Sequence, residues 1–223
     1  DQNIKYVSVN IPETTVKINR CFAGAYGSSN SGYNSAGTLE NSTNISGELV
    51  AVDFSQAVAL KTIDVQAFGY VSNLTGVIDL SNTKVEEILG NAFKGTAITG
   101  VILPTTLKRV GNDDATVTGS DAALFENCSK LEYIRVADGD TNAVFELPPH
   151  LEFIGYTAFC LEGTNIETRM KNTPFTIQIP KSVTEMQHTA IGFDDRMAMR
   201  NAQYLFEETD FANTKFQKDC LFA

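Results

Sequence analysis

The sequence has little that would support enzymatic chemistry. It contains only two histidines, His150 and His188, and neither has an acid and a nucleophile at a recognisable spacing. The nucleotide-binding patterns GxxxxGK[ST] and GxGxxG are absent, as is the zinc-protease pattern HExxH. We therefore expect both histidines to be surface or capping residues. We predict no catalytic residue, no cofactor and no metal site.

Positive charge is scarce relative to negative charge. The 223 residues include 17 Lys and Arg against 27 Asp and Glu, which gives a formal net charge of -10. A surface of this sign repels the phosphates of nucleic acid and the headgroups of anionic membranes. Nucleic acid is therefore not an expected partner.

Long apolar runs are also missing. No stretch approaches the ~20 apolar residues that cross a bilayer, so we expect no transmembrane segment in this chain. The first residue is Asp1 rather than Met, and we expect that a targeting segment has been removed or left out. A lipid anchor attached through such a leader is one alternative for surface attachment.

The four cysteines, Cys21, Cys128, Cys160 and Cys220, contain no CxxC pair and so lack the spacing of a zinc site. We expect most of them to be small buried residues, with a single disulfide as the alternative. Cys128 and Cys160 are expected one repeat layer apart, where core packing is favoured over a catalytic role. The redox compartment stays open.

What the sequence does contain is a repeat. Five pairs of apolar residues, each with a spacing of three, mark five copies: Leu60/Ile63, Val85/Ile88, Leu107/Val110, Leu151/Ile154 and Val183/Met186. In four copies a second apolar pair follows seven and eight residues after the first: Ala67-Phe68, Ala92-Phe93, Ala158-Phe159 and Ala190-Ile191. In the third copy Leu124-Phe125 takes this role after an insertion. The spacing within Val85 to Phe93 fits one side of a short helical turn.

Each copy also has a short strand signature, an alternation of apolar residues that ends in Pro or Ser. The five segments are Val52–Ser55, Ile78–Ser81, Val101–Pro104, Phe145–Pro148 and Ile177–Pro180. A repeat this small cannot bury its own apolar face, so we expect its strand to pair with neighbouring copies in a parallel sheet. Insertions at 112–123, 135–144 and 168–174 are expected to be loops.

The flanks of the repeats differ in composition. We predict an N-terminal strand-rich cap and Ser/Gly/Asn-rich connector at 1–46, repeats at 47–193 and a C-terminal cap at 194–223. Residues 1–26, the lead-in, could instead be a degenerate repeat, and so could residues 194–223, the tail. Asn41-Ser42-Thr43 would carry a sugar only in a eukaryotic secretory host.

Two groups of polar residues are candidates for binding. The stretch 138–142, with sequence DGDTN, begins like a calcium loop but lacks the later Gly and bidentate acid, so a solvated loop is favoured. The middle residues of the five strands should point outward on the open face of the sheet. We take them as the candidate ligand face: Asp53, Asp79, Ile102, Glu146 and Gln178. They are either solvated strand positions, which is the favoured interpretation, or a site for a basic or hydroxyl-rich partner.

The repeat resembles the BspA-like leucine-rich repeats, whose unit is similar to LxxIGxxAFxxCxxLxxIxIPxxV. One copy carries the resemblance at Ile88, Ala92, Phe93, Ile98, Val101, Leu103 and Pro104. A second carries it at Phe125, Asn127, Cys128, Leu131 and Phe145–Pro148, followed by Leu151, Ile154, Gly155, Ala158 and Phe159. The last clear copy has Ile177, Ile179, Pro180 and Val183.

The resemblance implies an α/β solenoid, a right-handed leucine-rich-repeat superhelix with a short-stranded parallel sheet and short helical or irregular convex turns. It implies a non-enzymatic module for protein binding or adhesion, secreted or on the outer surface of a bacterium, with a protein or glycan ligand of unknown identity. The alternatives are a structural spacer that presents a neighbouring domain and, third, an unrecognised hydrolase.

Overall fold

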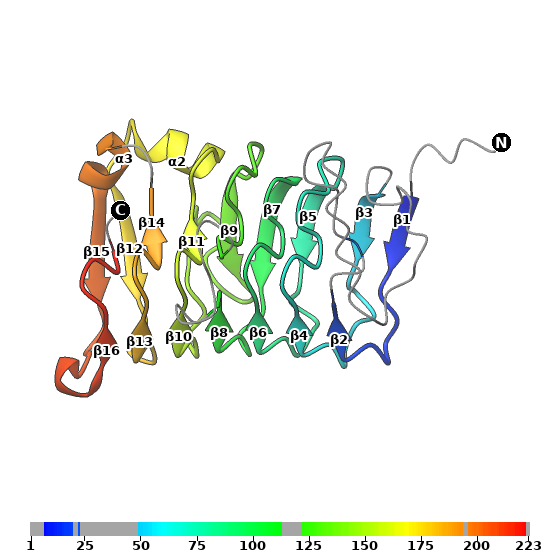
Figure 1. Ribbon diagram of the computed structural model, residues 1–223, viewed down its shortest axis with the longest axis horizontal. Coiled ribbons are helices and arrows are strands. Elements are labelled where there is room, and N and C mark those ends of the chain that lie inside the picture. Colours follow the sequence, from blue (N-terminus) through cyan, green and yellow to red (C-terminus); the bar gives the residue numbers. More distant parts are fainter. Residues whose placement is uncertain (1–6, 20–21, 23–48, 113–121, 194–195, 222–223) are drawn as a thin grey trace, which may run out of the picture.

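The computed structural model describes residues 7–19, 22, 49–112, 122–193 and 196–221. Its strands run parallel and stack in a row along the long axis of the molecule, from β1 at one end to β15 and β16 at the other (Figure 1). Each turn of the chain contributes one rung. The expected solenoid of parallel strands is confirmed.

The long strands form one side of the solenoid. They comprise β1 (Val7–Asn10), β3 (Leu49–Asp53), β5 (Thr75–Asp79), β7 (Ala97–Leu103), β9 (Tyr133–Val136), β12 (Phe175–Ile179) and β15 (Ala202–Phe206). They pair in parallel in three groups, β1-β3, β5-β7-β9 and β12-β15. Beyond β9 the row continues through a single bridge between Ile134 and Phe145. The stretch 145–148 is therefore not the strand that we predicted, and β9 ends inside the expected insertion at 135–144, of which it includes Arg135 and Val136.

A second side consists of strands of only two residues each. The strands β2 (Lys17–Ile18), β4 (Thr62–Ile63), β6 (Glu87–Ile88), β8 (Arg109–Val110), β10 (Phe153–Ile154), β13 (Glu185–Met186) and β16 (Lys215–Phe216) form one seven-stranded sheet in chain order. All ten residues of the five predicted apolar pairs are buried. The pairs therefore mark the core as expected.

The helical turn predicted within Val85 to Phe93 is wrong. Instead, β6 is followed by a corner at Asn91, whose backbone φ is 59°. A left-handed φ recurs three residues after the inward residue of four other short strands, at Gln66, Thr157, Thr189 and Asp219. A residue in this conformation cannot continue an α-helix. The corner at Asn91 therefore lies between Ile88 of β6 and the second buried pair, Ala92-Phe93.

The third side of the solenoid carries the second apolar pairs. Here the Phe68 N–H donates to the Ala92 carbonyl at 2.8 Å, and the Phe93 N–H donates to the Leu124 carbonyl at 3.1 Å. The equivalent bond in a later rung, from Phe159 to Ala190, is 2.8 Å long. Two short strands, β11 (Phe159–Cys160) and β14 (Ile191–Gly192), pair at this position. Backbone hydrogen bonds thus link the rungs at all three sides.

Phenylalanine rings stack through the core parallel to the long axis. Phe22, Phe68, Phe93, Phe125 and Phe159 follow one another with ring centroids 5.1, 5.4, 5.9 and 6.4 Å apart. The last four are completely buried. Each rung therefore places one ring on the ring of the preceding rung, in the offset range favourable for aromatic pairs.

In the part of the chain that the structure describes, three short helices lie outside the strand rows: α2 (Asn165–Met170), α3 (Arg196–Asn201) and the 3₁₀ helix η3 (Phe211–Asn213). Helix α2 covers part of the expected loop at 168–174. The Thr164 hydroxyl accepts the Glu167 N–H at 3.2 Å, and the Glu167 carboxylate accepts the Gly163 N–H at 3.1 Å. This reciprocal capping starts a helix that apolar periodicity alone did not indicate.

The lead-in and the tail contribute strands to both rows. Strands β1 and β2 pair with β3 and β4, while β15 and β16 pair with β12 and β13. The division of the chain at residues 46 and 193 stays a prediction. The connector, the Asn41-Ser42-Thr43 stretch and Cys21 lie outside the described residues, as does most of the insertion at 112–123.

Candidate ligand-binding face

The outward residues of β5, β7 and β9 form a row at the centre of the long-strand side. Strand register places Asp79 beside Ile102 and Ile102 beside Arg135. The bridge between Ile134 and Phe145 then places Glu146 next in the row after Arg135. The row therefore contains three of the predicted face residues, Asp79, Ile102 and Glu146, together with a cation that we did not predict.

Arg135 was missed because we placed the fourth strand at 145–148. The spacing that would have found it is present, since Cys128, Leu131, Ile134 and Val136 follow the CxxLxxIxI part of the repeat unit. The strand β9 with its central Arg135 matches this spacing. A basic residue thus lies within the face for which we considered a basic or hydroxyl-rich partner.

Three carboxylates of the predicted face bind the backbone of their own loops. Asp53 accepts the Ser55 N–H at 2.8 Å, and Asp79 accepts the Ser81 N–H at 2.9 Å. The hydrogen bond from the Ser55 backbone lowers the pKa of Asp53. Glu146 accepts the backbone N–H groups of Val136 at 3.2 Å and Asp140 at 3.1 Å. These acids stabilise strand ends and turns, in line with the structural interpretation of the row.

Gln178 also has a partner within the chain. Its side-chain amide donates to Glu207 at 2.8 Å, which links β12 to the segment after β15. Ile102 is half-buried, so its side chain is partly accessible at the centre of the face. The other four predicted face residues form hydrogen bonds within the chain. Ile102 is apolar, so its exposed surface is available for an apolar contact.

The aromatic ring of Tyr133 lies against β7, the strand that contains Ile102. At Gly100 in β7, an added Cβ would overlap the tip of the Tyr133 ring from β9, so the ring needs a glycine beneath it. The Arg135 guanidinium carbon lies 4.0 Å from the centroid of the same ring, within the range of a cation–π contact. Val77 on β5 is 40% exposed. We call Val77, Ile102, Tyr133 and Arg135 the central patch.

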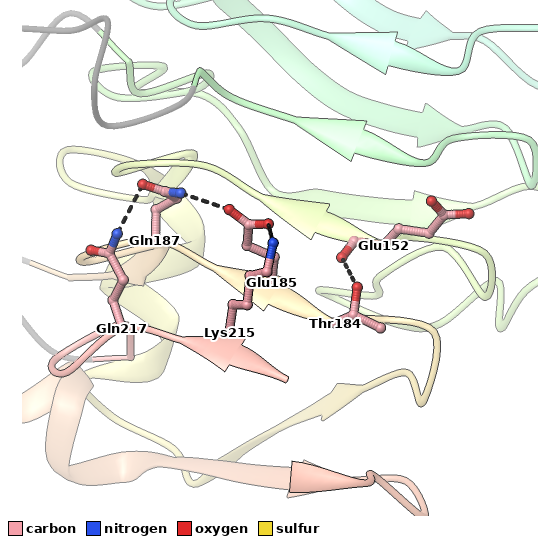
Figure 2. A network of polar contacts seen from close by, with 6 residues as sticks. All are labelled: Glu152, Thr184, Glu185, Gln187, Lys215 and Gln217. Carbon is pink, nitrogen blue, oxygen red and sulfur yellow. Dashed lines mark hydrogen bonds and ion pairs between the residues drawn. The ribbon is translucent and has the colours of Figure 1, made fainter. Parts of the chain in front are cut away.

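The outer face of the seven-stranded sheet has a different character. Its side chains pair with one another along the row: Lys17 with Asp64 at 2.7 Å, Lys108 with Glu86 at 3.6 Å and Arg109 with Glu87 at 3.8 Å. Toward the C-terminus, Figure 2 shows Gln217 donating to Gln187, Gln187 donating to Glu185 and Lys215 beside Glu185. The charged side chains of this face neutralise one another, so few of them are left to pair with a binding partner.

The other polar candidates take part in local structure. In the stretch 138–142, the Asp140 carboxylate accepts the Asn142 N–H at 2.8 Å, while Glu146 holds the turn from outside. His150 is exposed, and the His188 ring stacks on Tyr156 with centroids 5.9 Å apart. Among the residues that the structure describes, no cluster of His, Cys, Asp or Glu is arranged to hold a metal ion.

The described cysteines are free thiols. Cys128 is buried, and its thiol donates to the Phe93 carbonyl at 3.1 Å. Burial raises the pKa of Cys128 and of Cys160 to about 11 each, and it also raises the pKa of Cys220. Only the thiolate is an effective nucleophile. The environment of these thiols therefore favours packing over chemistry.

We expect Cys128 and Cys160 to react slowly with a thiol reagent in the native protein. With a pKa of about 11, roughly one thiol in a thousand is ionised at about pH 8. Labelling followed by peptide mapping should show slow native modification at both sites, faster as the pH approaches 11, and complete modification after denaturation. Rapid native labelling of either residue at pH 8 would contradict the burial of its thiol.

Parallel strand rows, buried apolar pairs at repeated spacing and corners with left-handed residues define a solenoid of the leucine-rich-repeat class. A family model described as BspA type leucine-rich repeat region matches six copies, over residues 2–114 and 59–192. The chain belongs to this family. The match counts one copy more than the five that we identified.

Two solved structures are similar at low sequence identity. A leucine-rich repeat protein from Bacteroides ovatus ATCC 8483 is 17% identical with a TM-score of 0.36, over 91% of this chain and 52% of that chain. A leucine-rich cell surface protein from Faecalibacterium prausnitzii A2-165 is 19% identical with a TM-score of 0.19, over 66% of this chain and 44% of that chain. This chain spans about half the length of each. Likeness at this level adds nothing to the family assignment.

The comparison with curated proteins found no match. Within the described ranges, every helix is too short or too polar to span a membrane.

Proposed function

We propose that this protein is a non-enzymatic module that binds a protein partner through the outer face of strands β5, β7 and β9. Membership in the leucine-rich-repeat family supports a binding role, because stacked repeats present extended surfaces to partners. The observation that carries the proposal is the central patch. It brings accessible apolar side chains together on one face of a solenoid whose short-strand face is occupied by internal ion pairs.

The aliphatic residues of the central patch, Val77 and Ile102, do not belong to the buried core cluster. The inward neighbours of Ile102, Val101 and Leu103, are completely buried and supply the core contact of β7. Side chains that combine apolar and aromatic surface with an arginine are typical of the residues that dominate protein interfaces. A partner that covers Val77 and Ile102 would remove this surface from water.

We further propose that the module acts in adhesion, secreted or at the outer surface of a bacterium. The family assignment supports this location by analogy. A leader or lipid anchor outside this chain would supply export and attachment. The candidate ligand face of the sequence analysis stays a proposal in a revised form, with Ile102 and Arg135 as its principal contacts and Asp53, Asp79, Glu146 and Gln178 around them.

The test is a binding screen of the full chain against purified host-matrix proteins and glycans. For a protein ligand found in this way, Ile102→Asp and Val77→Asp should each weaken binding by roughly tenfold or more, which corresponds to about 1.4 kcal/mol. The loss is expected because each change places an unpaired charge in the apolar part of the interface. Binding would be followed by surface plasmon resonance.

The matched control is Thr62→Asp, an outward position on the short-strand face, which should leave the affinity unchanged. Thermal melts should show that all three variants remain folded. A structural spacer would bind none of the ligands in the screen. Equal loss of binding in Thr62→Asp would also contradict the assignment of the site to the long-strand face.

A further inference from the structure

We propose that Arg135 is a preset anchor for a carboxylate, and that the partner of the central patch is a protein segment that places an Asp or Glu side chain on it. This inference rests on the proposed binding function of the face and specifies the chemistry of the partner. It follows from how the guanidinium is held, from the absence of an ion pair between Arg135 and any described carboxylate, and from the apolar surface next to it.

The guanidinium of Arg135 is held from two sides. Its Nε donates to the Ala143 carbonyl at 2.7 Å, and its carbon atom lies 4.0 Å from the centroid of the Tyr133 ring. The ring is in turn seated over Gly100, where a side chain would displace it. A planar guanidinium with fixed orientation loses little conformational freedom when its remaining N–H groups bind a carboxylate, and bidentate pairs of this type are strong.

A second arginine, Arg109, provides a comparison, because it has an acidic partner within the chain. Arg109, in the short-strand sheet, also lies over an aromatic ring, 3.9 Å from the centroid of Phe153. The Nε of Arg109 has an internal acid at 3.8 Å, Glu87. Among the described residues no carboxylate forms an ion pair with Arg135. The Glu146 carboxylate, which follows Arg135 in the row, accepts the backbone N–H groups of Val136 and Asp140.

The surroundings favour a protein segment over a glycan. One face of the Tyr133 ring is covered by the guanidinium, and the ring tip lies on Gly100. The ring is therefore poorly placed to stack against a sugar. Beside it, Ile102 and Val77 offer aliphatic surface. An acidic residue flanked by apolar residues matches this combination, because the carboxylate satisfies the cation while its neighbours cover the aliphatic groups.

The experiment selects a displayed library of random linear peptides against the full-length wild-type chain and its Arg135→Gln and Arg109→Gln variants. Peptides recovered on the wild type should be enriched in Asp or Glu at one position next to apolar residues. Arg109→Gln should select the same peptides, whereas Arg135→Gln should lose the acid preference. For a synthesised peptide, replacing its acid by the amide should weaken binding by roughly tenfold or more.

Variants at Tyr133 test its role as a positioning residue. Tyr133→Leu removes the ring beneath the guanidinium and should weaken the preference for the acidic peptide over its amide form. Tyr133→Phe keeps the ring and should restore that preference. Unfolding curves would confirm that both variants are folded.

The outcomes separate the inference from the proposed function. Peptides that depend on Ile102 but show no acid enrichment would overturn the carboxylate anchor and leave the binding face intact. Equal acid enrichment on Arg135→Gln would overturn it as well. Binding of an acidic glycan through Arg135, without peptide binding, would overturn the choice of a protein segment. Recovery of no peptide above the background of blank support would count against both proposals.

Discussion

Replacing Phe93 by alanine should lower the free energy of unfolding by about 3–5 kcal/mol. The Phe93 side chain is completely buried and stacks between Phe68 and Phe125, with centroids 5.4 and 5.9 Å away. Its removal forfeits the burial of the ring and leaves a cavity in the middle of the stack, where backbone hydrogen bonds between rungs restrict collapse. In a chain of this size the melting temperature should fall by roughly 2–4 °C per kcal/mol.

Circular dichroism during thermal and urea unfolding would measure this effect. Phe211→Ala is the matched control, since that residue in η3 is 58% exposed and its ring makes T-shaped contacts with Phe206 and Phe216. Its cost should stay below about 1.5 kcal/mol, the upper range for an aromatic pair. Equal losses in the two variants would show that the stack does not form the stabilising core.

Replacing Lys94 by alanine should destabilise the protein by about 3–5 kcal/mol. Its Nζ lies 2.8 Å from the Glu126 carboxylate of the next rung, and the two side chains are only 6% and 14% exposed. The Glu126 carboxylate also accepts the Asn127 side-chain amide at 3.2 Å. Without Lys94 the carboxylate would remain largely shielded from water with its main counter-charge gone, which is the source of the cost.

A double replacement distinguishes this explanation from lost packing. Lys94→Met combined with Glu126→Leu removes both charges while keeping apolar volume, so it should recover much of the stability lost in Lys94→Met alone. The exposed pair Lys108 and Glu86, at 3.6 Å with exposures of 48% and 42%, is the control, and its loss should cost no more than about 1 kcal/mol. Additive losses in the double variant would refute the role of the buried pair.

The core could be predicted from the sequence because each rung repeats the same local pattern. The pairs Leu60/Ile63 and Val85/Ile88 are buried as expected, and so are Phe68, Phe93, Phe125 and Phe159. An apolar residue at a repeated position has to face the interior whatever shape the backbone takes between those positions. This is why the core prediction was correct although the predicted helical turn was wrong. The apolar spacing from Val85 to Phe93 fits one face of a helical turn, but it fits a short strand followed by a corner equally well.

The candidate face was predicted only in part. Asp79, Ile102 and Glu146 do share a row, but the sequence analysis passed over Arg135 between Ile102 and Glu146. The error arose from choosing the wrong segment as the next strand across an insertion. The choice of neighbours on an outer face depends on hydrogen-bond register between rungs that are separated by loops of different length. The outward residues themselves carry no sequence pattern that indicates this register.

The sequence by itself determined the class of fold, the period of the repeat and the identity of the inward-facing residues. Each copy must bury its apolar side chains in the same way, so these features can be recognised in the sequence alone. The tertiary structure alone decided that Lys94 meets Glu126, that Tyr133 lies on Gly100 and that Arg135 lies beside Ile102. These contacts join residues of different rungs, and only the stacking of the rungs brings them together.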